Sequence, residues 1–210
     1  VDVSFAIHGR DVRSVSATVD LAGVSLNEAE AFDVVGKFAF GKDVNGWLAA
    51  ADELRVTTAR GTWPLTSIRV EAGTDSGRIA LLDARASYLD FADLPSILPW
   101  LGDAGAELHE RLKPDGRLRN LVATVSDPGE ALTDYAVTAE LERVGIDENG
   151  SYPGIRGFSG TLRADPNGGL LDVDSTNVMV TLSKYVPEPI EFDHVDGTVI
   201  WRKSGDRVTI

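Results

Sequence analysis

Hydrophobic and polar residues alternate along most of this chain. Residues 1–7 carry apolar side chains at every second position, and the same period of two returns in residues 15–21 and 67–72. Such alternation predicts β-strands with one buried face and one solvated face. The predicted strands are 1–7, 15–21, 37–40, 54–58, 67–72, 78–82, 118–125, 135–141, 170–174, 177–182, 198–201 and 208–210.

Turn sequences separate the predicted strands. Asp43-Val44-Asn45-Gly46 and Asp165-Pro166-Asn167-Gly168 have the Asp, Asn and Gly residues typical of tight hairpins. A weak repeat of glycine, strand, hairpin and returning strand begins at Gly36, Gly160 and Gly197. Glycines inside strands mark bulges or bends that curve a sheet. The pattern therefore predicts an elongated, curved antiparallel sheet, a β-groove built of repeated hairpins.

One region departs from this pattern. Residues 90–113 predict a short helical insertion in two pieces, in which Asp93 caps the first piece and Pro99 interrupts it. Ala104, Leu108 and Leu112 form an apolar stripe on the second piece. We therefore expect strands in residues 1–89, the insertion at 90–113, and strands again in 114–210.

Composition narrows the possible functions. The 210 residues carry a net charge of −13, with a pI near 4.6. This acidity argues against nucleic acid as a partner and against electrostatic docking on anionic lipid headgroups. The absence of cysteine excludes disulfides, thiolate zinc sites and cysteine nucleophiles.

The ends of the chain suggest a segment of a longer polypeptide, because both fall inside predicted strands and no initiating methionine is present. The sequence has no signal-peptide pattern and no apolar run approaching the roughly 18 residues that span a bilayer.

Candidate catalytic groups are few. His194 and Asp196 share one strand face as a possible metal or acid/base pair, but two groups do not make a catalytic constellation. Residues 172–177 resemble a calcium loop superficially, yet lack its glycine and its bidentate glutamate. We expect no catalytic residue, no metal and no cofactor, and hence no enzyme. The alternative of a carbohydrate-active protein would use acid pairs such as Asp193 and Asp196.

Linked motifs across the chain carry a resemblance to a known family. They are Phe91-Ala92-Asp93-Leu94-Pro95, Leu112-Lys113-Pro114-Asp115-Gly116-Arg117-Leu118, Pro153-Gly154-Ile155-Arg156-Gly157-Phe158, Pro187-Glu188-Pro189-Ile190 and Val195-Asp196-Gly197. Together they resemble the central region of the AsmA-like YhdP family. The resemblance implies a Gram-negative cell-envelope protein of the periplasm, anchored in the inner membrane through a segment absent from this chain. It also implies phospholipid transport between the membranes, in support of outer-membrane biogenesis.

The resemblance and the alternating pattern together predict a trough for phospholipid acyl chains. An apolar sheet face that no second layer covers would bind hydrocarbon, and the rest of the same polypeptide would continue the groove. The opposing interpretation is a closed β-sandwich, a non-catalytic scaffold or interaction module whose apolar faces cover each other. Insertion 90–113 would plug, gate or cap the trough. The candidate lining residues are Val56, Ile68, Val70, Ile79, Leu81, Val178, Val180, Leu182, Val199 and Trp201.

Overall fold

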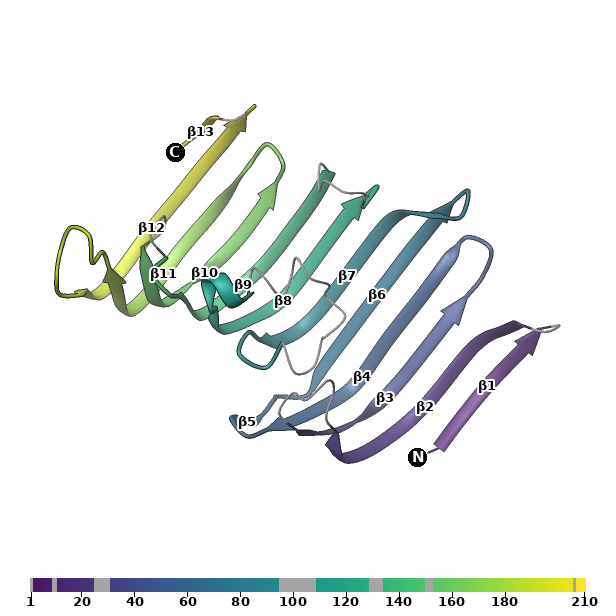
Figure 1. Ribbon diagram of the computed structural model, residues 1–210. Coiled ribbons are helices and arrows are strands. Elements are labelled where there is room, and N and C mark those ends of the chain that lie inside the picture. Colours follow the sequence, from purple (N-terminus) through teal and green to yellow (C-terminus); the bar gives the residue numbers. More distant parts are fainter. Residues whose placement is uncertain are drawn as a thin grey trace. The chain divides into compact units, whose positions relative to one another are not determined.

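The computed structural model describes residues 2–8, 11–24, 31–94, 109–128, 134–149, 153–205 and 207–210. These residues form one open antiparallel sheet of 13 strands, in which neighbours in sequence are neighbours in space (Figure 1). Short β5 alone lies off this path and pairs with β4. The antiparallel β prediction is confirmed, and a single sheet replaces the two facing sheets of the sandwich alternative.

The strands are longer than alternation alone predicts. The predicted strands at 170–174 and 177–182 are one strand, β11, which continues through Ser175 and Thr176. The bounds are β1 Asp2–His8, β2 Asp11–Val24, β3 Phe32–Lys42, β4 Gly46–Thr58, β5 Gly61–Thr62, β6 Thr66–Asp75, β7 Arg78–Asp90, β8 Asp115–Ser126, β9 Asp134–Ile146, β10 Gly154–Asp165, β11 Gly168–Thr181, β12 Ile190–Ser204 and β13 Arg207–Thr209.

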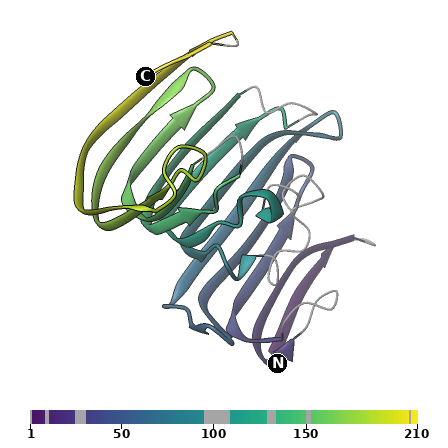
Figure 2. The ribbon, with the colours of Figure 1, turned by 60° about the vertical axis from the view of Figure 1, so that its left-hand side comes forward.

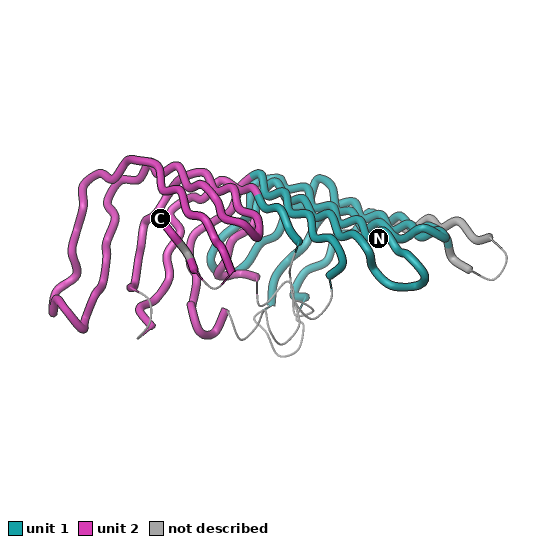
Figure 3. The backbone as a smooth tube through the Cα atoms, turned by 90° about the horizontal axis from the view of Figure 1, so that it is seen from above, with its two compact units in different colours: residues 1–88, 120–137 teal, residues 89–119, 138–210 magenta. Residues whose placement is uncertain are grey.

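The chain divides into two compact units, coloured separately in Figure 3. Unit 1 contains residues 1–88 and 120–137, and unit 2 contains residues 89–119 and 138–210. The boundary therefore passes through β7, β8 and β9. Each unit is described below on its own.

The hairpin between β3 and β4 in unit 1 follows directly from its sequence. The Asp43 side chain accepts a hydrogen bond from Asn45 N at 2.8 Å, which closes the turn. Thr74 N of β6 donates to Asn45 O at 2.7 Å. A Cβ on Gly46 would lie 1.9 Å from Ala72 O, so only glycine permits β4 to approach β6 this closely.

Unit 2 repeats this hairpin between β10 and β11. Asp165 accepts from Asn167 N at 2.7 Å, and Lys203 N of β12 donates to Asn167 O at 2.6 Å. A Cβ on Gly168 would lie 2.2 Å from Trp201 O. The first two copies of the predicted repeat thus end in equivalent turns, each fastened to the next strand by the same backbone bond.

The strands bend at residues with left-handed backbone. Figure 2 shows β11 and β12 turning part-way along their length. The register of β4 with β6 shifts between Ala51 and Leu54, and that of β10 with β11 between Arg156 and Gly160. Such bulges bend a strand and increase its twist. Residues with positive φ inside strands include Glu53, Asn120, Arg143, Gly157 and Asn177.

The described core of unit 1 lies beyond the bend of β4. Trp63 and Tyr88 meet edge to face with ring centroids 5.3 Å apart, and the side chains of Leu54 and Val56 are buried nearby in sequence on β4. Trp63 N donates to Val56 O at 2.8 Å, which holds the segment after β5 against β4. Trp63, with only 4 % of its surface exposed, is therefore part of this core.

The described ends of the predicted insertion are short helical turns at residues 91–94 and 109–112. Within unit 2, a His109 ring nitrogen lies 3.2 Å from Phe91 O, and Asp147 N donates to Leu112 O at 2.9 Å. The insertion is thereby anchored to the end of β9. Residues 95–108, which hold Trp100 and most of the predicted apolar stripe, lie outside the described residues.

Candidate functional site

The two faces of the sheet in unit 1 differ sharply in chemistry. Direct cross-strand partners in an antiparallel ladder point to the same face. One face, here called the apolar face of unit 1, carries two rows of directly paired residues. These rows are Phe38–Ala51–Ile68–Ala86 and Phe40–Ala49–Val70–Ala84.

The opposite face, called the polar face of unit 1, carries the intervening rows. They are Leu48–Glu71–Asp83 and Ala50–Arg69–Arg85. The Arg85 guanidinium, hydrogen-bonded to Asp83, holds the pKa of that carboxyl below its usual range. This face is therefore charged and solvated, whereas the apolar face leaves Phe40 40 % exposed without a polar neighbour in its row.

Unit 2 repeats the separation of faces. Its apolar face, named in the same way, begins near the β10–β11 hairpin with the rows Ala164–Gly169–Trp201, Leu162–Leu171–Val199 and Gly160–Val173–Gly197. The Trp201 indole covers Gly169 so closely that a Cβ there would lie 2.1 Å from its Cζ2 atom. In unit 1, Trp47 likewise pairs across the strands with a small residue, Ala72.

A hollow of about 430 Å³ lies in unit 2 where these strands bend. Val178 pairs with Phe192, and Val180 pairs with both Ile155 and Ile190. The hollow is lined by Ile155, Phe158, Val178, Val180, Phe192, His194, Val195 and Asp196. Six of these eight side chains are apolar, a lining suited to hydrocarbon.

The predicted lining residues fall in different surroundings. Val178 and Val180 line the hollow of unit 2, and Val199 and Trp201 lie on the apolar face of that unit. Ile68 and Val70 lie on the apolar face of unit 1. Leu182 follows the end of β11, where its carbonyl accepts from Tyr185 N at 2.8 Å.

Two predicted lining residues of unit 1, Val56 and Leu81, are not available on the apolar face, whereas Ile79 lies on it. Val56 is only 1 % exposed, so its side chain offers almost no surface to a ligand. Leu81 pairs with Gly73 and Ile79 with Thr74, because a register shift leaves Ala80 unpaired between them. Leu81 lies on the polar face because it alternates with Asp83, whereas the shift turns Ile79, the partner of Thr74, to the apolar face.

Sequence reasoning missed several residues of the hollow, chiefly Ile155, Phe158, Phe192 and Val195. The bulge at residues 157–159 interrupts the period of two on β10, so Ile155 and Phe158 share the hollow although three positions separate them. Phe192 is 41 % exposed, and an exposed large aromatic marks a binding surface only once the structure is known.

The predicted His194–Asp196 pair does meet, at the mouth of the hollow. The His194 Nε2 to Asp196 Oδ1 distance is 3.3 Å, and the two side chains are 53 % and 76 % exposed. Asp172, in the calcium-like run, accepts a hydrogen bond from Thr198 Oγ1 at 2.8 Å. Across the part of the chain that the structure describes, no three His, Asp or Glu side chains gather as metal ligands.

An ion-pair network braces unit 2. Glu142 accepts hydrogen bonds from Arg119 at 2.5 Å and Arg117 at 3.2 Å, and Arg117 also lies 3.5 Å from Asp90. The hydrogen bond from Arg119 is the main reason that the pKa of Glu142 lies below its usual range, opposed by partial burial. These contacts join β7, β8 and β9.

Comparison with known proteins gives one match. A sequence model described as "YhdP protein" matches residues 2–210. No curated protein and no solved structure matches the chain. Among the described residues, no helix is long and apolar enough to cross a membrane.

Proposed function

Because the chain belongs to the YhdP family, we propose that it is a segment of a periplasmic, bridge-like protein that carries phospholipid between the inner and outer membranes. Acyl chains lie against the apolar faces, and an inner-membrane anchor belongs to another segment of the polypeptide. The observation that carries the proposal is the 430 Å³ hollow of unit 2, with its mainly apolar lining. The role is transport rather than catalysis.

The energetics favour binding without a deep pocket. Burial of each methylene contributes about 0.8 kcal/mol, so a 16-carbon tail gains about 12 kcal/mol at most. Apart from Trp201, the rows on the apolar faces consist of Ala, Gly, Val, Ile, Leu and Phe, whose side chains offer contact but no hydrogen bond that would fix one position. A tail therefore slides between similar sites, as transport requires.

The first experiment asks whether the protein carries lipid. The purified chain is extracted and examined by native mass spectrometry, and we expect co-purifying phospholipid. A fluorescent phospholipid is then titrated into the variants Val180→Asp and Ile68→Asp. Each variant places a charge on an apolar face. We expect at least a tenfold loss of affinity in each variant, because the carboxylate must be desolvated against a hydrocarbon chain.

Matched controls place the same charge on the other face. Met179→Asp lies beside Val180 but pairs with Arg156 and Glu191, and Ala50→Asp pairs with Arg69 in unit 1. Both controls should bind lipid as the native chain does. Unchanged uptake by both apolar-face variants would reject the assignment of faces, and a chain that neither retains nor binds phospholipid would reject the function.

A further inference from the structure

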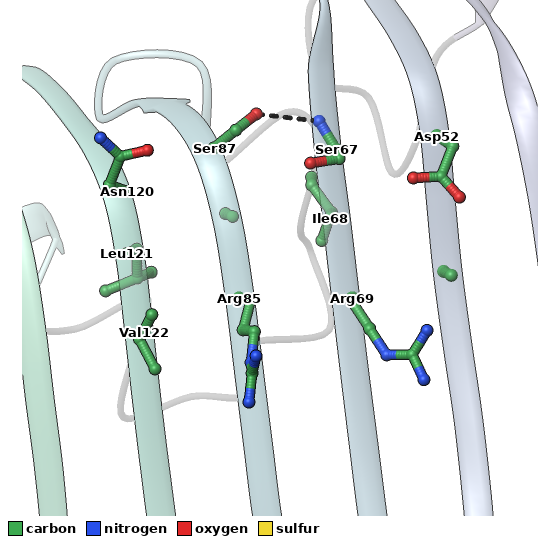
Figure 4. Close-up of a pocket in the computed structure, with 11 residues that line it drawn as sticks. Asp52, Ser67, Ile68, Arg69, Arg85, Ser87, Asn120, Leu121 and Val122 are labelled. Carbon is green, nitrogen blue, oxygen red and sulfur yellow. Dashed lines mark hydrogen bonds between the residues drawn. The ribbon is translucent and has the colours of Figure 1, made fainter.

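A second hollow lies in unit 1, mainly on the polar face, and Ile68 and Ala86 of the apolar face also line it. Its volume is about 320 Å³, and Figure 4 shows Ser67 and Ser87 at one end of it and Arg69 and Arg85 at the other. It is lined by Ala50, Asp52, Ser67, Ile68, Arg69, Arg85, Ala86, Ser87, Asn120, Leu121 and Val122.

Two arginines line this hollow from neighbouring strands. Arg69 of β6 and Arg85 of β7 are direct cross-strand partners, and like charges in that relationship repel. Their side chains are 51 % and 62 % exposed, so both guanidinium groups are accessible from solvent. An anion bound between them would relieve the repulsion.

The arginines are held in position by carboxylates one row away. Arg69 Nε donates to Glu71 at 2.5 Å, and Arg85 Nε donates to Asp83 at 2.9 Å. Asp83 is itself fixed by Thr124 Oγ1 at 3.1 Å. Within the described residues, neither guanidinium has another hydrogen-bond acceptor, so the remaining N–H groups of each arginine are left to a ligand.

Hydroxyl groups complete the opposite end of the hollow. Ser87 Oγ accepts the backbone N–H of Ser67 at 2.9 Å (Figure 4), which leaves the Ser87 hydroxyl proton to donate elsewhere. Asn120 adopts a φ of 50° at the bend of β8 and brings its side chain to the same end. Asp52 supplies the one carboxylate of the lining, against two arginines.

From this geometry we infer that the hollow on the polar face of unit 1 is a binding site for a phosphate group. Each guanidinium keeps N–H groups with which arginine binds phosphate oxygens in pairs. Arg69 and Arg85 lie on the face opposite the proposed lipid path, although Ile68 belongs to both linings.

The test titrates sodium phosphate into the full chain, by calorimetry and by NMR of the arginine Nε–H signals, with sodium chloride at equal ionic strength as reference. We expect phosphate-specific shifts at Arg69 and Arg85, and at least a tenfold weaker affinity in Arg69→Gln/Arg85→Gln. The control Arg55→Gln removes an exposed arginine of β4 outside the hollow and should leave the affinity unchanged. Unfolding curves of the variants check that each is folded.

Vesicles of phosphatidylglycerol then identify the source of the phosphate. Co-sedimentation that free phosphate competes away assigns the site to a lipid headgroup, whereas phosphate binding without vesicle binding assigns it to a soluble phosphate ester. The inference is overturned if chloride reproduces the NMR shifts, or if the double variant retains the native affinity. Neither result would touch the lipid-uptake test with Val180→Asp, because Val180 lies in the hollow of unit 2.

Discussion

Ser175 Oγ accepts a hydrogen bond from the backbone N of Ser159 and donates one to Ser159 O, each at 2.8 Å. The β10–β11 ladder is interrupted at this point, so a serine side chain replaces the missing backbone partner. Ser159 Oγ likewise accepts a hydrogen bond from Arg143 N on β9, at 3.0 Å. Serine hydroxyls thus satisfy the backbone groups that the bend of unit 2 would leave unpaired.

Loss of this hydroxyl should destabilise unit 2. Ser175 is 1 % exposed, and Ser175→Ala leaves the N–H of Ser159 buried without an acceptor. We expect a loss of about 1–3 kcal/mol in the free energy of unfolding, measured by urea denaturation. Thr176→Ala, at the exposed neighbouring position, should change it by less than about 0.5 kcal/mol. Equal effects of the two variants would mean that the hydroxyl is not structural.

The hairpin glycines should resist substitution because backbone atoms occupy the space of a Cβ. Gly46→Ala and Gly168→Ala would place that atom 1.9 Å and 2.2 Å from carbonyl oxygens. Each should destabilise the chain by more than about 1 kcal/mol in thermal or urea unfolding. Gly41→Ala is the matched control, since the nearest atom to its Cβ lies 3.9 Å away. A stable Gly46→Ala chain would show that the hairpin is not as tight as described.

The network around Glu142 should contribute to stability in a pH-dependent manner. Its pKa is lowered in the folded state, chiefly by Arg119. The stabilisation is therefore present above the unfolded-state pKa of about 4.3 and is lost as the pH falls through the folded-state value. Glu142→Gln should flatten this acid limb of the stability curve, measured by urea unfolding between pH 3 and pH 7. An unchanged pH dependence would exclude Glu142 as a contributor.

The core of unit 1 should depend on the Trp63–Tyr88 contact. Trp63 is 4 % exposed, so Trp63→Ala should cost roughly 3–5 kcal/mol of unfolding free energy. Trp47 is only half-buried, and Trp47→Ala should cost clearly less. Near-ultraviolet circular dichroism would report the loss of the ordered ring pair. A larger loss from Trp47→Ala would place the core elsewhere.

Prediction from the sequence succeeded where a local pattern decides the outcome. The hairpin at Asp43–Gly46 was predictable because the Asx turn and the glycine are determined by neighbouring residues. Prediction failed where the pairing between strands decides which face a side chain occupies. The register shift at Ala80 puts Leu81 and Ile79 on opposite faces, although alternation predicts that they share one, and no local signal marks the unpaired residue.

The candidate site shows the same division. Val178 and Val180 were predicted as lining residues and do line the hollow of unit 2. Phe158 and Phe192 were missed, because the bulge on β10 and the neighbouring strand β12 bring them there. The phosphate hollow was missed entirely, since Arg69 and Arg85 lie 16 positions apart and meet only through the β6–β7 register.

The sequence by itself determined that this protein is an acidic antiparallel β protein with amphipathic strands, because period-two alternation and turn residues act over a few positions. The tertiary structure decided which side chains share a face, which are covered, and where hollows remain. Those properties depend on strand register and bulges, and a shift of one residue moves a side chain to the other side of the sheet.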